Sequence, residues 1–387
     1  MLKTDKLYYK DAYIYEFDAT VISLEQRDGK YLAVLDKSAF FPEAGGQYSD
    51  KGYIGDAEVL DVQESGDMLV HYLSKPINVN ETYHCKLDFE DRLEKMRAHT
   101  AEHILSGIFH KLYGVENTGF HLGATEVTFD TSIVITKEQL ELVERLANEA
   151  VIRNLSVTEY YPSPDELPSL KYRSKLDLTE NVRIVYIEDT DACACCAPHV
   201  KTTGEIGFIK ILDAVKHKGG SRIRMLAGKK AYEYVAVLAR ETGAVSVLLS
   251  SPQTEISKDV ERLLESKCEL DEKLLARERE LASLYAESVT ETKGNFVLLC
   301  GTLDMEALRG IANNVGERVS GALVLLSGTD GAYRYVIRYE KDDFKTFLSE
   351  ANASLLGKGG GRPPMAQGSF TASISDIKTY FGLFTIA

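Results

Sequence analysis

Residues 95–108 read Lys95-Met-Arg-Ala-His99-Thr-Ala-Glu102-His103-Ile-Leu-Ser-Gly-Ile108. They lie in a longer stretch, 89–113, whose apolar side chains recur with helical spacing, at Leu93, Met96, Ile104, Leu105, Ile108 and Leu112. This spacing predicts one helix over 89–113. Residues four apart lie one above the other on a helix, so His99 and His103 can both face one ion.

A second motif, Cys195-Cys196-Ala-Pro-His199, has the same separation between its metal-binding residues. A Cys and a His added to two histidines would give three imidazoles and one thiolate, a tetrahedral set suited to zinc. Cys193 and Cys196 are rival ligands, and we prefer Cys195 because its distance in sequence from His199 matches that of the first pair. The pattern predicts one Zn²⁺ per chain, bound by His99, His103, Cys195 and His199.

The spacing leaves the role of the zinc open. Four permanent protein ligands would make it a closed, structural ion, whereas access for water or substrate would make it a Lewis acid. His99-x-x-Glu102-His103 also fits the H-x-x-E-H signature of inverted zinc peptidases, in which the Glu is the general base. That alternative leaves Cys195 and His199 without a role and needs a further carboxylate ligand.

Composition narrows the class of protein. At 387 residues the chain is too long for one ordinary core, and two or three domains are expected. A formal charge of −14 argues against a general affinity for nucleic acid or anionic membranes, although it leaves room for a local basic patch. No apolar run is long enough to span a membrane, and the N-terminus has no signal core, so a cytoplasmic location is predicted. Six cysteines form no disulfide framework.

The order of predicted elements gives an α+β fold of four parts. Residues 1–88 read as strands near 13–17, 20–24, 31–35 and 58–62, which predicts a small β-barrel. Residues 89–240 form the zinc-containing part, with a second helix from about 137 to 154 started by Thr136 and Gln139, and strands near 183–188 and 207–212. Residues 241–292 are a helical linker, and 293–387 a small α/β domain.

The linker contains a heptad pattern over about 257–289, with Val260, Leu263, Leu270, Leu274, Leu281 and Leu284 on one seam. Two interpretations stay open. The helix either covers a neighbouring domain of the same chain, or it joins two chains, so that a homodimer would form through the linker or the C-terminal domain.

Several motifs together resemble a known family. His99-x-x-x-His103 with Cys195-x-x-x-His199 is similar to the zinc signature of the editing domain of alanyl-tRNA synthetase and the freestanding AlaX proteins. Phe40-Phe-Pro-Glu-Ala-Gly-Gly-Gln47 resembles the family's aromatic-Pro-x-x-Gly-Gly-Gln loop, and Lys218-Gly-Gly-Ser-Arg-Ile-Arg224 its later basic segment. Gly357-Lys-Gly-Gly-Gly-Arg-Pro-Pro is similar to the glycine-rich signature of the DHHA1 domain. No segment resembles an adenylate-forming domain, so the resemblance is to a long-form AlaX protein.

The resemblance implies a hydrolase that acts in trans on tRNA(Ala) wrongly charged with serine, or with glycine. Zinc would polarise the carbonyl, hold the attacking water or bind the amino acid, and the sequence leaves these three open. Ser38 and Gln47 match the family's pocket loop, although many members carry Thr at the place of Ser38. Gln47, on that loop, and Glu102, next to the zinc ligand His103, are the candidate catalytic residues, and His121 is a further candidate for substrate binding. Glu102 would act as a base or as a partner of a ligand, and alanyl-tRNA synthetases often carry a non-acidic residue at its place. A tight turn at Gly45-Gly46 and a buried structural role for His121 are the simpler alternatives.

Contacts to tRNA are predicted in two places. Residues 201–230 hold eight basic side chains against Glu205 and Asp213, a local charge of +6, which suits phosphate contact. Within it Lys216, Lys218, Arg222 and Arg224 are the candidates, and Lys358 and Arg362 form a second candidate surface in the C-terminal glycine loop. A solvated surface loop is the alternative. A non-catalytic tRNA-binding protein with structural zinc is the competing function.

Overall fold

The computed structural model describes residues 3–123, 125–174 and 182–382, and it divides into two compact units, 1–243 and 244–387. The mixed α+β class is confirmed. The finer division into four parts stays a prediction, and its expected boundary at 240/241 falls inside a helix, α3 (Gly228–Leu249). Among the described residues, no helix combines the length and the hydropathy that a bilayer crossing needs.

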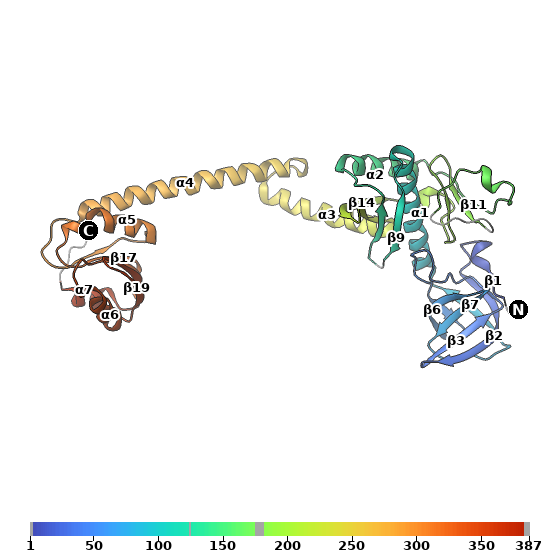
Figure 1. The fold of residues 1–387 in the computed structure, drawn as a ribbon, viewed down its shortest axis with the longest axis horizontal. Helices are drawn as coiled ribbons and strands as arrows, with labels where there is room; N and C mark the ends of the chain where they lie inside the picture. Colours follow the sequence, from blue (N-terminus) through green and yellow to red (C-terminus); the bar gives the residue numbers. More distant parts are fainter. Residues whose placement is uncertain (1–2, 124, 175–181, 383–387) are drawn as a thin grey trace. The chain divides into compact units, whose positions relative to one another are not determined.

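The first unit begins with a closed β-barrel (Figure 1). Its strands, in their order around the barrel, are β2 (Glu16–Arg27), β3 (Lys30–Leu35), β7 (Met68–Leu73), β6 (Ala57–Ser65), β5 (Gly52–Ile54) and β8 (Thr82–Leu87). The two strands expected at 13–17 and 20–24 are wrong as separate elements, because β2 runs without a break through Thr20. Beside the barrel, β1 (Asp5–Lys6) pairs with β4 (Lys37–Ser38), and the short 3-10 helix η1 (Leu7–Tyr9) follows β1.

Helix α1 (Phe89–Tyr113) leaves the barrel directly after β8 and has the bounds that the apolar spacing predicts. Asp88 caps its first turn by accepting from the Asp91 N–H, and Gly114 ends it in the left-handed conformation. Helix α2 (Lys137–Ile152) starts with the expected capping box of Thr136 and Gln139 and stops two residues before the predicted end.

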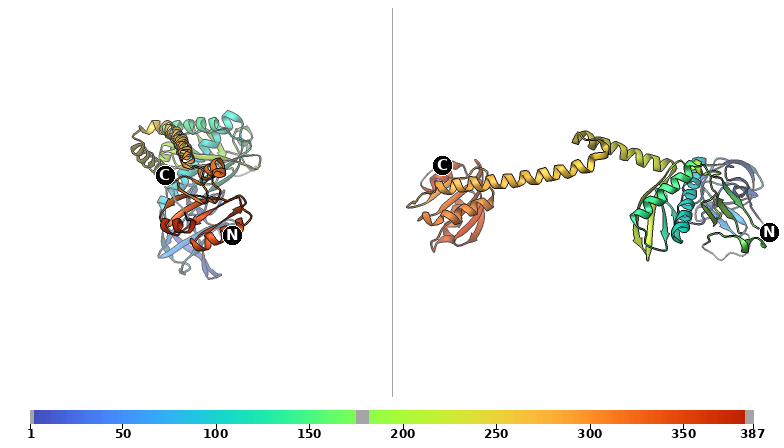
Figure 2. Two further views of the ribbon diagram at one scale, coloured as in Figure 1. Left: turned by 90° about the vertical axis from the view of Figure 1, so that its left-hand side faces the viewer. Right: turned by 90° about the horizontal axis from the view of Figure 1, so that it is seen from above.

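Helices α1 and α2 cover one face of a four-stranded sheet (Figure 2). The sheet has the order β14-β15-β10-β9, formed by β14 (Ile209–His217), β15 (Gly220–Ala227), β10 (Val127–Thr131) and β9 (Asn117–Leu122). A separate sheet is formed by β11 (Val157–Tyr160), β12 (Ile184–Ile187) and β13 (Asp191–Ala194), and its last strand leads into the Cys195 loop.

In the second unit, the five-stranded sheet has the order β16-β17-β18-β20-β19, with α5 (Met305–Val315) on one face and α6 (Phe344–Ser354) and α7 (Ile374–Phe381) on the other (Figure 1). The strands are β16 (Phe296–Leu299), β17 (Leu323–Thr329), β18 (Ala332–Arg338), β19 (Lys358–Arg362) and β20 (Met365–Phe370). The glycine-rich segment expected as a loop therefore contains an edge strand, β19.

Helix α4 (Ile256–Ser288) spans the heptad pattern. Its seam leucines are exposed in the single chain, with 58% of Leu263 and 61% of Leu274 accessible. A homodimer through this seam stays a prediction.

A buried charge cluster attaches α1 to the barrel. Arg92 is fully buried, and its guanidinium donates to Asp50 Oδ2 and to the backbone carbonyls of Ala12 and Ala39. Lys95 donates to Ser49 O at 2.8 Å and pairs with Asp50 and Asp91. The loop that follows β4 is thus held against the first turns of α1.

We expect Arg92→Met to lower the free energy of unfolding by about 3–5 kcal/mol, because it leaves the buried Asp50 carboxylate without its main partner. Urea denaturation followed by circular dichroism measures this. Arg145→Met is the matched control, because Arg145 pairs with Glu149 on the exposed face of α2 and this pair should contribute less than about 1 kcal/mol. Equal losses in the two variants would contradict the role of the buried pair.

Candidate metal centre and active site

Two distant segments meet at one cluster of metal-binding side chains. The ligand atoms of His99, His103, Cys195 and His199 all lie within 4.8 Å of one another. The histidines of α1 are buried, as is His199, and Cys195 is half-buried. The four residues predicted from the two motifs are therefore brought together.

Cys193 forms a second group with His103 and Asp191, and it lies outside the group that contains all three histidines. Cys196 is exposed and belongs to neither group. This arrangement supports Cys195 as the thiolate of the cluster, ahead of its two neighbours.

Each imidazole is oriented through its Nδ1 atom. His99 Nδ1 lies 3.0 Å from Gln47 Oε1, and His103 Nδ1 lies 3.1 Å from Asp191 Oδ2. His199 Nδ1 lies 2.9 Å from Thr100 Oγ1, whose own proton goes to the Met96 carbonyl at 2.7 Å. Because all three partners accept, each ring carries its proton on Nδ1 and presents the Nε2 lone pair, as metal-binding histidines do.

The donor set fits zinc in chemistry and in spacing. Cys195 Sγ lies 3.7 Å from His99 Nε2 and 3.4 Å from His199 Nε2. In a tetrahedron with Zn–N of about 2.0–2.1 Å and Zn–S of about 2.3 Å, the N-to-S separation is about 3.5 Å. The side chains therefore surround a space of the size that a four-coordinate Zn²⁺ needs.

Charge and burial favour the ligating forms of His199 and Cys195. At His103 burial acts to lower the pKa, but Cys193 and Asp191 outweigh it and hold that pKa well above its ordinary value. Burial lowers the pKa of His199 to about 3, which keeps its imidazole neutral. Burial acts to raise the pKa of the Cys195 thiol, but the neighbouring His99 and His199 imidazoles outweigh it and hold that pKa well below its ordinary value. Burial also acts to raise the pKa of Asp191, and hydrogen bonds from Arg173 and His103 reverse this. Asp191 therefore stays ionised opposite His103.

The backbone around the cluster is held by close approaches at two glycines. Gly46 has φ +85°, and a Cβ there would lie 2.4 Å from the Phe120 carbonyl oxygen, so the loop can lie against β9 only without a side chain. Because this contact fixes the loop, the Gln47 side chain lies against the His99 ring. A Cβ at Gly107 would lie 2.7 Å from Asp191 Cβ, so this glycine lets β13 reach α1.

The cluster forms part of the wall of a cavity of about 390 Å³. Glu102 lines it, is buried, and accepts a hydrogen bond from Asn117 Nδ2 at 2.5 Å. Arg173 also lines it and makes two hydrogen bonds of 2.7 Å to the Asp191 carboxylate. Phe120 stacks on the His99 ring at 4.6 Å between centroids. The volume falls in the range of small-molecule sites.

The other predicted pocket residues lie elsewhere. Ser38 is fully buried and its hydroxyl lies 2.9 Å from His71 Nε2, in the barrel. Gln47 is fully buried behind His99, and its Nε2 has no hydrogen-bond partner among the described residues. His121 is exposed, because neighbours on a strand point to opposite faces and Phe120 takes the inner one. In the described part of the chain, none of the three lines the cavity. Their roles in binding and catalysis stay predictions.

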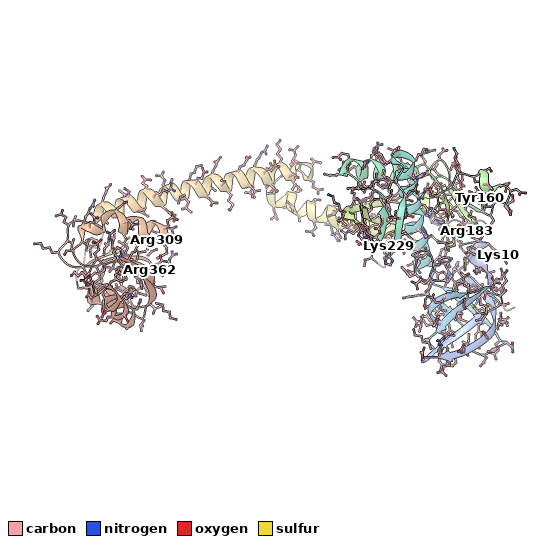
Figure 3. The ribbon with its side chains drawn as sticks, in the orientation of Figure 1. Lys10, Tyr160, Arg183, Lys229, Arg309 and Arg362 are labelled. Atoms are coloured by element: carbon pink, nitrogen blue, oxygen red, sulfur yellow. The ribbon has the colours of Figure 1, made fainter. Side chains whose placement is uncertain are left out.

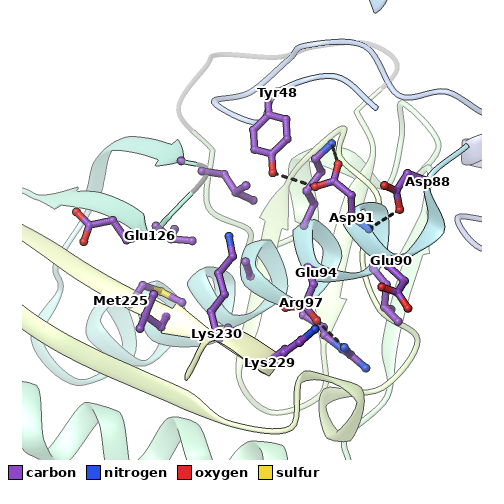
Figure 4. Close-up of a pocket in the computed structure, with 18 residues that line it drawn as sticks. Tyr48, Asp88, Glu90, Asp91, Glu94, Arg97, Glu126, Met225, Lys229 and Lys230 are labelled. Carbon is purple, nitrogen blue, oxygen red and sulfur yellow. Dashed lines mark hydrogen bonds and ion pairs between the residues drawn. The ribbon is translucent and has the colours of Figure 1, made fainter. Parts of the chain in front are cut away.

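A second cavity, of about 430 Å³, lies beside the first turns of α1 (Figure 4). Tyr48 donates there to Asp91, and Arg97 pairs with Glu94. Its wall contains none of the four clustered side chains. Although it is the larger of the two, it lacks the donor set on which the candidate chemistry depends.

The predicted basic segment is largely paired with acidic residues, most of which lie outside it. Arg222 binds Asp130 through two hydrogen bonds, and Arg224 binds Asp213 and Glu126. Lys201 pairs with Asp11, and Lys210 with Glu144. The local charge of +6 is therefore mostly compensated, while Lys216, near the end of β14, and Lys218, in the turn that follows, remain exposed. Lys358 and Arg362 are exposed on the edge strand β19.

Sequence reasoning missed the residues that support the ligands. Thr100 and Asp191 each orient an imidazole, and Arg173 fixes the Asp191 carboxylate. Arg183 holds the Cys195 loop by donating to the carbonyls of Cys195 and Ala197. Asp191 and Arg173 meet α1 only through the tertiary fold, so no local spacing identifies them. Thr100 was visible inside the first motif, but its helix position alone gave no reason to expect a bond to His199.

The chain is similar to known proteins over nearly its whole length. The family described as "Threonyl and Alanyl tRNA synthetase second additional domain" matches residues 182–225. The chain is 27% identical to the alanyl-tRNA editing protein AlaX-L of Pyrococcus horikoshii, over 96% of each protein. It is 28% identical to the alanyl-tRNA editing protein Aarsd1 of Danio rerio, over 93% of this chain and 92% of that one.

The chain is also 29% identical to the alanine–tRNA ligase of Archaeoglobus fulgidus, over 95% of this chain but 42% of the ligase, so it spans less than half of that enzyme. Among solved structures, the C-Ala domain of Aquifex aeolicus alanyl-tRNA synthetase matches 23% of this chain and 86% of that domain, at 23% identity and a TM-score of 0.19, which is too low to support a structural argument. The chain therefore contains the second additional domain of threonyl- and alanyl-tRNA synthetases at residues 182–225, and over nearly its whole length it resembles the freestanding AlaX-type alanyl-tRNA editing proteins.

Proposed function

We propose that this protein is a trans-editing hydrolase, which removes serine or glycine from wrongly charged tRNA(Ala) by hydrolysing the aminoacyl ester. The observation that carries the proposal is the cluster of His99, His103, Cys195 and His199, three of which (His99, His103 and Cys195) line a cavity that also holds the buried carboxylate Glu102. Two of the similar proteins are alanyl-tRNA editing proteins, and this likeness supports the same substrate class. A cytoplasmic location is part of the proposal, because charged tRNA is used there.

We infer that the cluster holds one Zn²⁺. Three Nε2 lone pairs and a thiolate of lowered pKa support this, as do the Nε2-to-Sγ distances of 3.4 and 3.7 Å. Bound there, the ion supplies a positive charge and Lewis acidity at the cavity wall. Gln47, Asp191 and Thr100 act as positioning residues, since each holds one imidazole by its Nδ1 atom.

In the proposed reaction, Glu102 is the general base. Its carboxylate lies in the cavity, in the residue directly before His103 and three residues after His99, and its Oε1 is held by the Asn117 amide. It accepts the proton of the water that attacks the ester carbonyl. An ester is already activated, so placing the water and the carbonyl side by side is the main requirement. We also propose that Glu102 and Asn117, as polar groups of the wall, meet the amino-acid part of the substrate.

A non-catalytic tRNA-binding protein with structural zinc is the second candidate. The observation in its favour is that the cluster offers four protein ligands, which is typical of closed, structural zinc sites. The peptidase alternative has less support. Asp191, the carboxylate that pairs with His103, bonds the Nδ1 of that ring, on the side away from Nε2.

We expect the protein to release serine from Ser-tRNA(Ala), or glycine from Gly-tRNA(Ala), and to leave Ala-tRNA(Ala) intact. Glu102→Gln should lower kcat by about 10²–10⁴-fold through loss of the base. Glu90→Gln, an exposed position of the same helix, should keep full activity. Release of the radiolabelled amino acid measures both. Tight binding of the RNA with no turnover of any ester would favour the second candidate instead.

The metal is tested separately. We expect one Zn²⁺ per chain in competition titrations with a chromophoric chelator, and Asp191→Asn should weaken its binding by about 10–100-fold because His103 loses its charged partner. Asp189→Asn is the control, since Asp189 is exposed and at φ +56°, where Asn is well tolerated. Equal affinities of the two variants would remove Asp191 from its positioning role.

The basic segment makes a third prediction. Replacing the exposed Lys216 and Lys218 by Ala should reduce the slope of log affinity for tRNA against log salt by about 1 to 2, because two phosphate contacts are lost. Arg222→Ala with Arg224→Ala should change the slope less, since Asp130 and Asp213 already neutralise these guanidinium groups. Filter binding over a salt series measures it. If only the arginine variant changes the slope, the lysines do not contact RNA.

A further inference from the structure

The mouth of the metal-site cavity has an aromatic wall. Tyr161 follows β11, Tyr9 ends the short helix η1 beside the barrel, and both line the cavity. Their rings lie 6.4 Å apart at 87°, an edge-to-face contact. Tyr161 leaves 53% of its surface accessible. Half of a large aromatic side chain thus remains uncovered at a concave site.

Arg183 connects this wall to the cluster. Its guanidinium lies 5.4 Å from the centre of the Tyr9 ring and donates to the carbonyls of Cys195 and Ala197, at 2.8 and 2.9 Å. Glu159, on β11 close to Tyr161, pairs with the same guanidinium. Figure 3 shows Arg183 in the same region as Tyr160, the neighbour of Tyr161. The aromatic wall and the Cys195 loop are therefore parts of one hydrogen-bonded unit.

The chemistry of an aminoacyl ester on RNA determines what the cavity must hold. The ester oxygen belongs to the terminal ribose, so only one sugar separates the carbonyl from the terminal base. With the carbonyl at Glu102, that base has to lie against another wall of the same cavity. Phe120 is already stacked on His99, and Tyr9 is covered by Arg183 and Tyr8. Tyr161 is the aromatic of the described wall with the most free surface.

We propose that Tyr161, with Tyr9 against it edge to face, is the stacking surface for the terminal nucleobase of the acylated RNA. This inference rests on the proposed function and adds a subsite to it. Stacking on an aromatic ring depends on the flat π-face that every base has, so it holds the RNA end without reading its sequence. Selection of the amino acid and of the tRNA would then lie in other parts of the protein.

The first test is kinetic. We expect Tyr161→Ala to raise KM for a serine-charged RNA hairpin by about tenfold, the effect of losing one base stack, with kcat unchanged because the base contributes equally to ground and transition states. Tyr161→Phe should behave as the wild type, since the ring and not the hydroxyl is required. Tyr53→Ala is the matched control. Tyr53 is also 53% exposed, but it lies on β5, away from the described walls of both cavities.

The second test uses binding alone, without turnover. Uncharged hairpins that end in CCA, or in the same sequence with an abasic terminal residue, are titrated against wild type and variants. If Tyr161 stacks the terminal base, removing the base and removing the ring cost the same interaction, so the two losses are not additive. For Tyr53→Ala, the loss of binding affinity on removal of the terminal base should equal the loss that the wild type shows.

The outcomes separate the two proposals. Suppose that the wild type hydrolyses the ester, but that the affinity losses caused by Tyr161→Ala and by the abasic end add fully. That result would overturn the subsite and leave the proposed function intact. A wild type that hydrolyses none of the esters would overturn the proposed function and the subsite with it. We expect Tyr161→Ala to lose affinity for the CCA hairpin only, and Tyr161→Phe to keep the affinity of the wild type.

Discussion

One face of helix α1 holds the residues that attach it to the barrel and two of the four side chains of the candidate metal site. Arg92 and Lys95 reach Asp50 and the adjoining loop, and His99 and His103 continue the same face one and two turns further along. A charge pair this deep in the core is costly to bury and more costly to break, so the helix and the loop have one mutual position. That position brings Gln47 to Nδ1 of His99. The ligand geometry thus depends on an ion pair that never touches the ligands' metal-binding atoms.

The three imidazoles of the candidate metal site are each held in place by a neighbouring residue. Their Nδ1 partners come from three places: Gln47 in the loop after β4, Thr100 on α1 itself, and Asp191 on β13. An imidazole with its proton fixed on Nδ1 has only Nε2 left for a metal. Arg173 in turn fixes Asp191, so the cluster is supported by a second layer of bonds that reaches the cavity wall. Substitutions in this layer act on the chemistry without changing a ligand.

The excess of basic charge counted along one segment of the sequence is largely neutralised in the folded protein. Counted along residues 201–230, basic side chains are in large excess. In the fold, the carboxylates of Asp130, Glu126 and Glu144 arrive from neighbouring elements and pair with them. With a formal charge of −14, the protein has little long-range attraction for RNA. Under the proposed function, binding of RNA would rest on a few exposed cations and on short-range contacts such as stacking.

The sequence by itself determined the local features. Apolar spacing set the bounds of α1, the Thr136 and Gln139 pair marked the start of α2, and two equal spacings identified the four clustered side chains, because each of these signals depends on residues a few positions apart. The tertiary structure decided the rest. It assigned Phe120 rather than His121 to the cavity, placed Ser38 beside His71, and brought Asp191 and Arg173 to the cluster. Those positions follow from packing between segments far apart in the chain, and no periodicity along the sequence records such packing.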